Sequence, residues 1–353
     1  MPLAPGGLLE LSPEGLYCRA AHAWIDPWRP VPRALITHAH ADHARPGCGE
    51  YWAVASSEGI LRERLGSEIK LLPVDYGQLH RIGDARVSFH SAGHVLGSAQ
   101  IRLEAGGESW LVSGDYKRCA DPSCAPFEPV QADVFISEAT FGLPIYQWQS
   151  GATVAAQILE WWRAASDRPS VLFCYAFGKA QRVLAELYRL GVNDEVLLHG
   201  AVERLMGPYR DAGVLLPPTR PLAQLERNAD LAGRLLIAPP GAHRSRGLSR
   251  FAKAQNGFVS GWMAVRGVRR RRGYGKGFVM SDHADWAGLL RSVRDSGAQQ
   301  VYVTHGQSHG LARYLREVEG LSADPLEGRF ETERFDDDEV VPTAALEREH
   351  ENS

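Results

Sequence analysis

The sequence predicts an α/β protein, and three observations support that prediction. The chain has 353 residues, 44% of them hydrophobic, so it can bury one large core or two of ordinary size. Short apolar segments without helical periodicity recur along the chain and end in glycine or polar residues, as strands do. In the middle of the chain, residues 153–165 and 178–190 carry apolar residues at helical spacing.

Charge and cysteine content narrow the functional classes. Charged residues make up 23% of the chain and the formal net charge is −3, so nucleic-acid binding would require a local positive surface. The five cysteines form no C-x-x-C pair, which favours a reducing cytoplasm, and we interpret Cys119 and Cys124 as loop residues rather than metal ligands. The first residues lack the features of a signal peptide, and no apolar run approaches a membrane span. We therefore expect a soluble, cytoplasmic protein.

The N-terminal segments are predicted strands at residues 8–11, 16–20 and 23–25, the last of which leads into Asp26. Asp26 has two equally supported interpretations. It is a turn residue before a proline, or it is a carboxylate whose hydrogen bonds fix a nearby loop of metal ligands.

The next strand, residues 33–37, runs into the densest group of metal-ligating side chains in the chain. His38, His40, Asp42 and His43 lie within six positions. Alternation along the strand places the first two on one side, and a following turn brings the other two behind them. Imidazole and carboxylate ligands at this density indicate zinc or a similar divalent ion, and the arrangement suits two ions better than one.

Three later segments repeat this pattern of an apolar strand with a polar end. Their strands are residues 86–90, 110–113 and 134–138, and the polar residues that follow or end them are His94, Asp115 and Glu138. An isolated histidine is more often a core residue than a ligand, but His94 lies between two glycines that permit a close approach of the backbone. One edge of the fold is therefore expected to collect these side chains.

These motifs resemble those of the metallo-β-lactamase superfamily, and later ones resemble its β-CASP branch of nucleases. The superfamily's ligand motifs are matched in order and spacing by Asp26, His38-x-His40-x-Asp42-His43, His94 and Asp115. The β-CASP branch includes Artemis-like DNA nucleases, RNase J enzymes and the cleavage-and-polyadenylation endonuclease. Four further segments resemble its motifs: Ser137-Glu138-Ala139-Thr140, Phe177-Gly178-Lys179-Ala180-Gln181, Ser281-Asp282-His283-Ala284-Asp285 and Val303-Thr304-His305-Gly306.

The resemblance implies an αββα sandwich with a small inserted α/β domain. The implied division is residues 1–148 and 276–335 for the metallo-β-lactamase domain, 149–275 for the β-CASP insert, and 336–353 for an acidic, flexible tail. Within the insert, we expect residues 170–175 and 234–238 to be strands and residues 178–190 to be a helix. That helix would turn Val183, Leu184, Leu187 and Leu190 inward, and Trp161 and Trp162 are interpreted as packing residues.

The same resemblance implies the chemistry. His38, His40 and His94 would hold one divalent ion, Asp42, His43 and His305 the other, and Asp115 would bridge them. Zinc is the first choice of ion, with manganese or iron as alternatives. The ions would activate a water for attack on phosphorus, and His283, oriented by Glu138, would protonate the leaving oxygen. The implied catalytic group is therefore His283, Glu138, Asp26 and Asp42.

Positive charge is concentrated in one segment that lies shortly before His283. It comprises Arg266, Arg269, Arg270, Arg271, Arg272 and Lys276, threaded with glycines. A charge run is usually a solvated loop, but in a chain of net charge −3 this one is interpreted as a contact to the nucleic-acid backbone. Lys179 near a helix start is a candidate phosphate contact, although an exposed lysine without such a role is the commoner case.

The choice between DNA and RNA rests on two opposed features. His305 in the last motif is typical of RNA-processing relatives. The combination of Ile25-Asp26-Pro27-Trp28-Arg29-Pro30 with Ser281-Asp282-His283-Ala284-Asp285-Trp286 is most similar to a bacterial subgroup of DNA-ligase-associated exonucleases. We therefore predict a DNA exonuclease in repair with a functional link to a DNA ligase, and an RNA-processing enzyme as the alternative. The residues indicate no oligomeric state.

Two other classes share part of the pattern. A lactonase, thioesterase or β-lactamase would use the metal ligands but would need neither the insert, nor the arginine segment, nor His283. An inactive binding module would be expected to lack ligands, and none is missing here.

Overall fold

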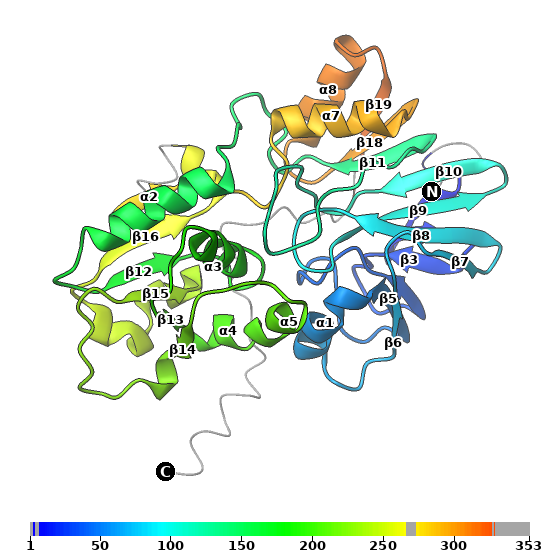
Figure 1. The fold of residues 1–353 in the computed structure, drawn as a ribbon. Coiled ribbons are helices and arrows are strands. Elements are labelled where there is room, and N and C mark those ends of the chain that lie inside the picture. Colours follow the sequence, from blue (N-terminus) through cyan, green and yellow to red (C-terminus); the bar gives the residue numbers. More distant parts are fainter. Residues whose placement is uncertain (1–2, 4–6, 266–272, 327, 329–353) are drawn as a thin grey trace.

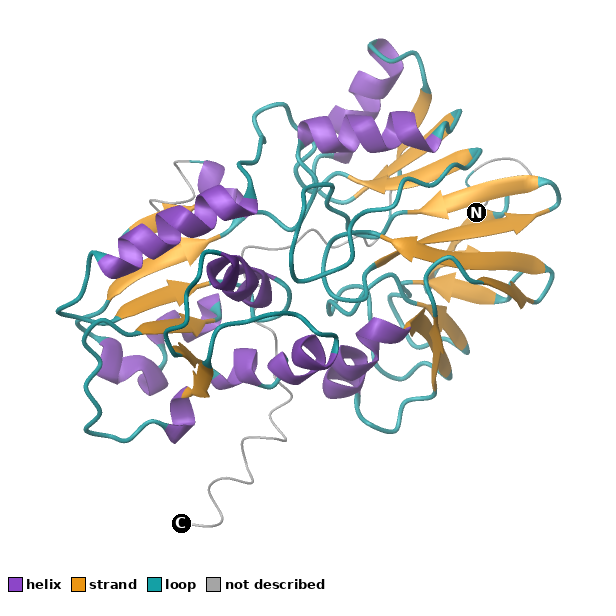
Figure 2. Ribbon diagram, in the orientation of Figure 1, coloured by secondary structure: helices purple, strands orange, loops and turns teal. Residues whose placement is uncertain are grey.

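The computed structural model describes residues 3, 7–265, 273–326 and 328. The chain forms three β-sheets with helices on their outer faces, which is a mixed α/β fold (Figures 1 and 2). Two sheets come from the two ends of the chain and the third from its middle. In the described residues, no helix is both long and apolar enough to cross a membrane.

The first sheet is built from the N-terminal residues. Its strand order is sequential, with antiparallel pairing up to β3 and parallel pairing from β3 onward. The strands are β1 (Leu9–Ser12), β2 (Gly15–Cys18), β3 (Ala23–Ile25), β4 (Arg33–Leu35), β5 (Glu50–Val54) and β6 (Leu71–Val74). The short helix η1 (Ala55–Ser57) and α1 (Glu58–Leu65) connect β5 to β6.

The second sheet joins segments that are far apart in the sequence. Its order is β19-β18-β11-β10-β9-β8-β7, in which β10, β11, β18 and β19 are parallel and the rest antiparallel. The strands are β7 (Leu79–Ile82), β8 (Ala85–Ser91), β9 (Ala99–Ala105), β10 (Glu108–Val112), β11 (Val134–Glu138), β18 (Gln300–Thr304) and β19 (Ser322–Pro325). Two helices, α7 (Trp286–Ser296) and α8 (Ser308–Glu317), lie against it.

Core packing places these two sheets face to face. One buried cluster combines Leu16 and Leu35 of the first sheet with Phe89, Ile101 and Trp110 of the second. A second cluster covers the opposite face of the second sheet with Leu289 of α7 and Leu311 of α8. The layers thus follow from alternating buried positions in strands and one apolar stripe in each helix.

The third sheet and its helices form the middle part of the chain. Its strands are all parallel, in the order β14-β13-β15-β12-β16-β17. They are β12 (Ser170–Phe173), β13 (Val196–Leu198), β14 (Thr219–Pro221), β15 (Leu235–Ala238), β16 (Gln255–Val259) and β17 (Lys276–Phe278). The helical segments are α2 (Gly151–Arg163), α3 (Lys179–Arg189), α4 (Gly200–Glu203), α5 (Met206–Asp211), η2 (Leu222–Gln224), η3 (Pro240–Arg244), η4 (Arg246–Phe251) and η5 (Gly261–Ala264).

Local signals explain where the longer helices begin. The Ser150 hydroxyl accepts a hydrogen bond from the Thr153 N–H at the start of α2, and the Asp285 carboxylate accepts one from the Gly288 N–H at the start of α7. At the start of α3, the Gln181 side chain accepts a hydrogen bond from the Gly178 N–H. The last acid of the Ser-Asp-His-Ala-Asp motif is therefore a helix cap.

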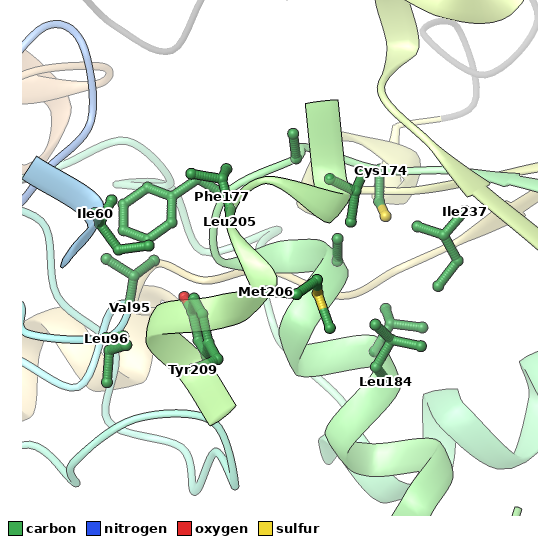
Figure 3. Close-up of a cluster of buried hydrophobic side chains, with 14 of the residues drawn as sticks. Ile60, Val95, Leu96, Cys174, Phe177, Leu184, Leu205, Met206, Tyr209 and Ile237 are labelled. Atoms are coloured by element: carbon green, nitrogen blue, oxygen red, sulfur yellow. The ribbon is translucent and has the colours of Figure 1, made fainter. Parts of the chain in front are cut away.

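The middle part packs directly against the first sheet. One buried cluster joins Ile60 of α1 and Val95 to Phe177, Met206 and residues of α2 and α3, as Figure 3 shows for part of it. Below we call residues 149–278 the insert.

Two predictions about this region need correction. The boundary predicted after residue 275 would assign β17 to the other domain, whereas β17 pairs with β16 in the third sheet. Leu190, predicted to point inward, is 39% exposed because α3 ends at Arg189. Its neighbours Val183, Leu184 and Leu187 are buried as predicted, and Trp162 lies in the core.

Candidate metal centre

The predicted ligands meet at the carboxyl ends of the strands that precede them. His38, His40, Asp42 and His43 follow β4, His94 follows β8, Asp115 follows β10 and His305 follows β18. Their ligand atoms form two groups in which all atoms lie within 4.8 Å of one another: His38, His40, His94 and Asp115, and Asp42, His43 and His305. We call them the three-histidine group and the second group.

The three-histidine group is compact. His40 Nδ1 lies 3.0 Å from His38 Nε2 and 3.1 Å from His94 Nε2. Asp115 Oδ2 lies 3.5 Å from His38 Nε2 and 3.8 Å from His94 Nε2. Lone pairs of three imidazoles and one carboxylate therefore converge on one point, which suits a divalent ion with nitrogen and oxygen ligands.

The second group shares Asp115 with the first. Asp115 Oδ2 lies 3.5 Å from His43 Nε2, and Asp42 Oδ2 lies 3.6 Å from the same nitrogen. The His43 and His305 rings stack with 5.4 Å between their centroids. The Asp115 carboxylate thus lies between both groups, and its role as a bridging ligand stays a prediction.

Two observations test whether these residues fit metal ions. The His43 Nε2 and Asp115 Oδ1 atoms are buried without a hydrogen-bond partner, and a bound cation would satisfy both. Burial lowers the pKa of His43, but Asp42, Asp115 and Asp26 outweigh it and raise that pKa to about 10. A histidine pKa that is raised by neighbouring carboxylates marks a site that favours positive charge. Both observations fit divalent cations.

Most other ligands are in the protonation state that metal binding requires. Burial, together with the neighbouring histidines, lowers the pKa of His38 and His94 well below its usual value. Burial also lowers the pKa of His305 to about 4. Burial alone would raise the pKa of Asp42, but His43, His40 and His305 lower it. Neutral imidazoles and an ionised carboxylate are ligand forms.

Asp26 holds the histidine loop through hydrogen bonds. Its Oδ1 accepts from the Thr37 N–H at 2.8 Å and its Oδ2 from the Thr37 hydroxyl at 2.5 Å. The same Oδ2 lies 2.7 Å from His43 Nδ1, which directs Nε2 toward the second group. Of the two sequence interpretations, this geometry matches a carboxylate whose hydrogen bonds fix the loop of candidate metal ligands, rather than a simple turn residue. Asp26 therefore positions His43.

Thr37 is a residue that the sequence interpretation missed. Besides Asp26, its hydroxyl lies 3.1 Å from His38 Nδ1. Gly114 makes the packing possible, because its φ is +54° and a Cβ there would lie 2.6 Å from the Thr37 side chain. The only sequence signal for Thr37 is its position directly before the first ligand.

His283 and Glu138 form a buried pair beside the three-histidine group. His283 Nδ1 lies 2.9 Å from both carboxylate oxygens of Glu138, and the His283 ring centroid is 4.8 Å from that of His94. The Glu138 carboxylate also accepts hydrogen bonds from the backbone N–H groups of Tyr116 and Thr140. Burial alone would raise the pKa of Glu138, but His283 and these hydrogen bonds lower it, so the carboxylate is ionised.

The predicted nucleic-acid contacts fall into three sets. Arg266, Arg269, Arg270, Arg271 and Arg272 lie outside the described residues. Lys276 is exposed in β17. Lys179 is 3% exposed, and its Nζ lies 2.7 Å from Asp282 Oδ2. A buried, paired ammonium cannot reach a phosphate on the surface, so the interpretation of Lys179 as a phosphate contact, and equally as an exposed lysine, is corrected.

Comparison with known proteins identifies the superfamily. A "Probable DNA ligase" of Opitutus terrae is 33% identical over 313 residues, which are 88% of this chain and 30% of that protein. An endoribonuclease of Mycosarcoma maydis is 23% identical over 83% of this chain and 43% of its own length. A ribonuclease of Thermus thermophilus is 28% identical over 47% of this chain and 45% of its own. The chain belongs to the β-CASP branch of the metallo-β-lactamase superfamily.

Each of these β-CASP relatives is longer than the region it shares with the chain, which spans less than half of their length. No family model matches the chain. Among solved structures, a protein of unknown function from Enterococcus faecalis aligns with a TM-score of 0.57 at 10% identity, over 85% of this chain and 80% of that one. At this identity the likeness concerns the fold.

Proposed function

We propose that the protein is a metal-dependent nuclease that hydrolyses phosphodiester bonds of DNA, as an exonuclease in DNA repair. The observation that carries the proposal is the position of the Asp115 carboxylate between the two ligand groups, with the His283–Glu138 pair beside them. Its Oδ2 lies 3.5 Å from both His38 Nε2 and His43 Nε2. When bound, two divalent ions, zinc first and manganese or iron as alternatives, supply an activated water and offset charge on the phosphate. The layers of sheets and helices support an αββα sandwich carrying the insert.

The chain's own residues have distinct tasks in this proposal. His38, His40 and His94 would hold one ion, and Asp42, His43 and His305 would hold the other, with Asp115 close enough to serve both. Asp26 orients His43. Glu138 orients His283 through Nδ1, so that Nε2 of the imidazolium is the nitrogen that would give its proton to the leaving oxygen, and the neutral imidazole would remain.

The exposure of the ligands supports a large substrate that binds to the metal centre from one side. His40, Asp42 and His305 are partly exposed, whereas His38, His43, His94 and Asp115 are buried. A phosphodiester can therefore approach over the partly exposed ligands. The arginine segment and Lys276, which belong to the last part of the insert in the sequence, are proposed to contact the nucleic-acid backbone.

DNA is preferred as the substrate because a relative that aligns with 88% of the chain is named a probable DNA ligase. Cleavage that leaves a 5′-phosphate and a 3′-hydroxyl prepares ends that a ligase can join, which supports a functional link between the two activities. The five cysteines are free, which fits a reducing cytoplasm. RNA processing is the second candidate, because two relatives are named as ribonucleases and His305 completes the second group.

One assay separates these possibilities. Metal-free protein is supplied with zinc, manganese or iron and with single- and double-stranded DNA and RNA of one sequence, labelled at either end. Progressive shortening of DNA from one end supports the proposal, and cleavage confined to RNA would select the alternative. Turnover of a lactone or thioester without nucleic-acid cleavage would replace both with a small-molecule hydrolase. Inactivity with every ion would reject the metal centre.

A further inference from the structure

The insert and the segment that leaves it contact two ligands of the three-histidine group. His94 Nδ1 lies 2.7 Å from the carbonyl oxygen of Asp282, four residues after β17. His40 Nε2 lies 3.5 Å from the carbonyl oxygen of Phe177, and its ring packs edge-on against the Phe177 ring at 4.8 Å. Both contacts engage the ring nitrogen that faces away from the metal. They therefore set which nitrogen is left to bind it.

Two cationic side chains of helix α3 in the insert bind Asp282, the residue whose carbonyl oxygen contacts His94. Lys179 Nζ lies 2.7 Å from Asp282 Oδ2. Arg182 Nη1 lies 3.0 Å from Asp282 Oδ1 and 2.6 Å from the carbonyl oxygen of Ser281. The Asp282 side chain thus faces the insert while its carbonyl faces His94, so a shift of α3 moves a contact of the metal ligand.

These contacts of Lys179 and Arg182 with Asp282 are buried. Lys179, Arg182 and Asp282 are each at most 5% exposed, and Lys117 and Asp121 complete the cluster from the metal-binding part. Buried ion pairs contribute little net stability because desolvation offsets their attraction. Moving one partner of such a pair away is nevertheless costly in free energy, because it leaves the other charge buried without a counter-charge. The cluster is therefore better suited to fixing a position than to stabilising the fold.

Apolar side chains of the insert also pack directly against the segment that follows His94. Val95, the residue after His94, packs near Phe177 in the cluster of Figure 3. A Cβ added at Gly178, whose φ is +84°, would lie 2.4 Å from Val95 Cγ1. The N-cap residue of α3 therefore has no room for a side chain, and the insert packs closely against Val95, the residue after His94.

We propose that docking of the insert and metal binding at the three-histidine group are mutually dependent, with Arg182 and Lys179 as the positioning residues. The insert then has a second role besides substrate contact, because it completes the surroundings of His94 and His40. Coupling of this kind is reciprocal: a docked insert raises metal affinity, and bound metal holds the insert in place. The inference rests on the proposed metal centre and is independent of which nucleic acid is cleaved.

Two variants perturb the contact in different ways. Arg182→Met removes the Arg182 contacts to Ser281 and Asp282 while keeping an unbranched side chain. Lys117 and Lys179 remain beside Asp121 and Asp282. Gly178→Ala keeps every charge and instead forces a Cβ against Val95. The matched control is Arg163→Met, which removes an arginine from an exposed ion pair with Asp194 in the same insert.

The measurement is zinc binding to metal-free protein in competition with a chelator. In Arg182→Met and Gly178→Ala, we expect one of two zinc ions to bind at least about tenfold more weakly, the scale of lost contacts to ligand histidines. The other ion and both ions of Arg163→Met should bind as in the wild type. In a His94→Ala background, Arg182→Met should have a smaller further effect, because only the contact between Phe177 and His40 still links the insert to the ligands.

Several outcomes would overturn the inference. These are unchanged zinc binding in both variants, equal weakening of both ions, or the same effect of Arg182→Met with and without His94. A wild type that binds no zinc would instead remove the proposed metal centre. Hydrogen exchange on the wild type needs no variant: zinc should slow amide exchange in residues 175–189 around the start of α3, and unchanged exchange there would overturn the coupling.

Discussion

Replacing His283 by alanine provides a direct test of the proposed mechanism. Loss of a general acid typically costs about 10²–10⁴-fold in rate, or about 2.7–5.4 kcal/mol at about 1.36 kcal/mol per tenfold. We expect a loss within this range for nucleic acid, because Glu138 holds His283 through both carboxylate oxygens at 2.9 Å. The zinc content should stay near that of the wild type, since the ligand atoms of both metal groups remain.

The choice of substrate separates proton donation from other roles of His283. With bis(p-nitrophenyl) phosphate, the leaving phenolate needs no proton, so His283→Ala should lose far less activity than with nucleic acid. His90→Ala is the matched control, because His90 Nδ1 also lies 2.9 Å from a carboxylate, that of Glu128, at the protein surface. Asp115, Glu138 and His283 are also close enough to hold an ion together. Loss of zinc from His283→Ala, or equal losses on both substrates, would refute the assignment as a general acid.

Three further predictions concern the metal centre. Asp115→Asn should lose both zinc and activity, as measured by metal analysis and turnover, because one carboxylate serves both groups. Asp26→Asn should weaken one zinc ion about 10–100-fold in chelator competition, since His43 loses an oriented acceptor; equal affinity would remove its positioning role. Zinc affinity should rise with pH between about 7 and 10, because burial raises the pKa of Asp115 to about 8, carboxylates raise that of His43 to about 10, and both must lose a proton to bind metal. Calorimetry in buffers of different ionisation enthalpy measures that proton release, and an affinity independent of pH would contradict it.

The metal ligands could be predicted because the information for them is local. His38, His40, Asp42 and His43 are close in the sequence, and the others follow apolar strands whose ends meet at one edge. The inward residues of α3 were equally predictable from periodicity, up to the point where the helix ends before Leu190.

The environment of those ligands depends on packing between distant segments. Nothing in the sequence near Lys179 or Arg182 distinguishes a buried cation from an exposed one, because both face Asp282, about a hundred residues away in the chain. The role of the Asp282 carbonyl is invisible for the same reason, since any residue type provides a carbonyl. The position of Thr37 directly before His38 is visible in the sequence, so a hydrogen bond from its hydroxyl to the ligand loop is predictable in principle.

The spread of the ligands along the chain has a consequence for synthesis. The second group needs Asp42 and His43 from the first sheet and His305 from β18, and the insert lies between them. At about 5–20 residues per second, His305 leaves the ribosome roughly tens of seconds after His43. A nascent chain therefore carries an incomplete catalytic centre while it is still attached to the messenger RNA that encodes it. The proposed hydrolytic activity would therefore arise only after His305 has emerged, and nucleic acid close to the ribosome would be spared until then.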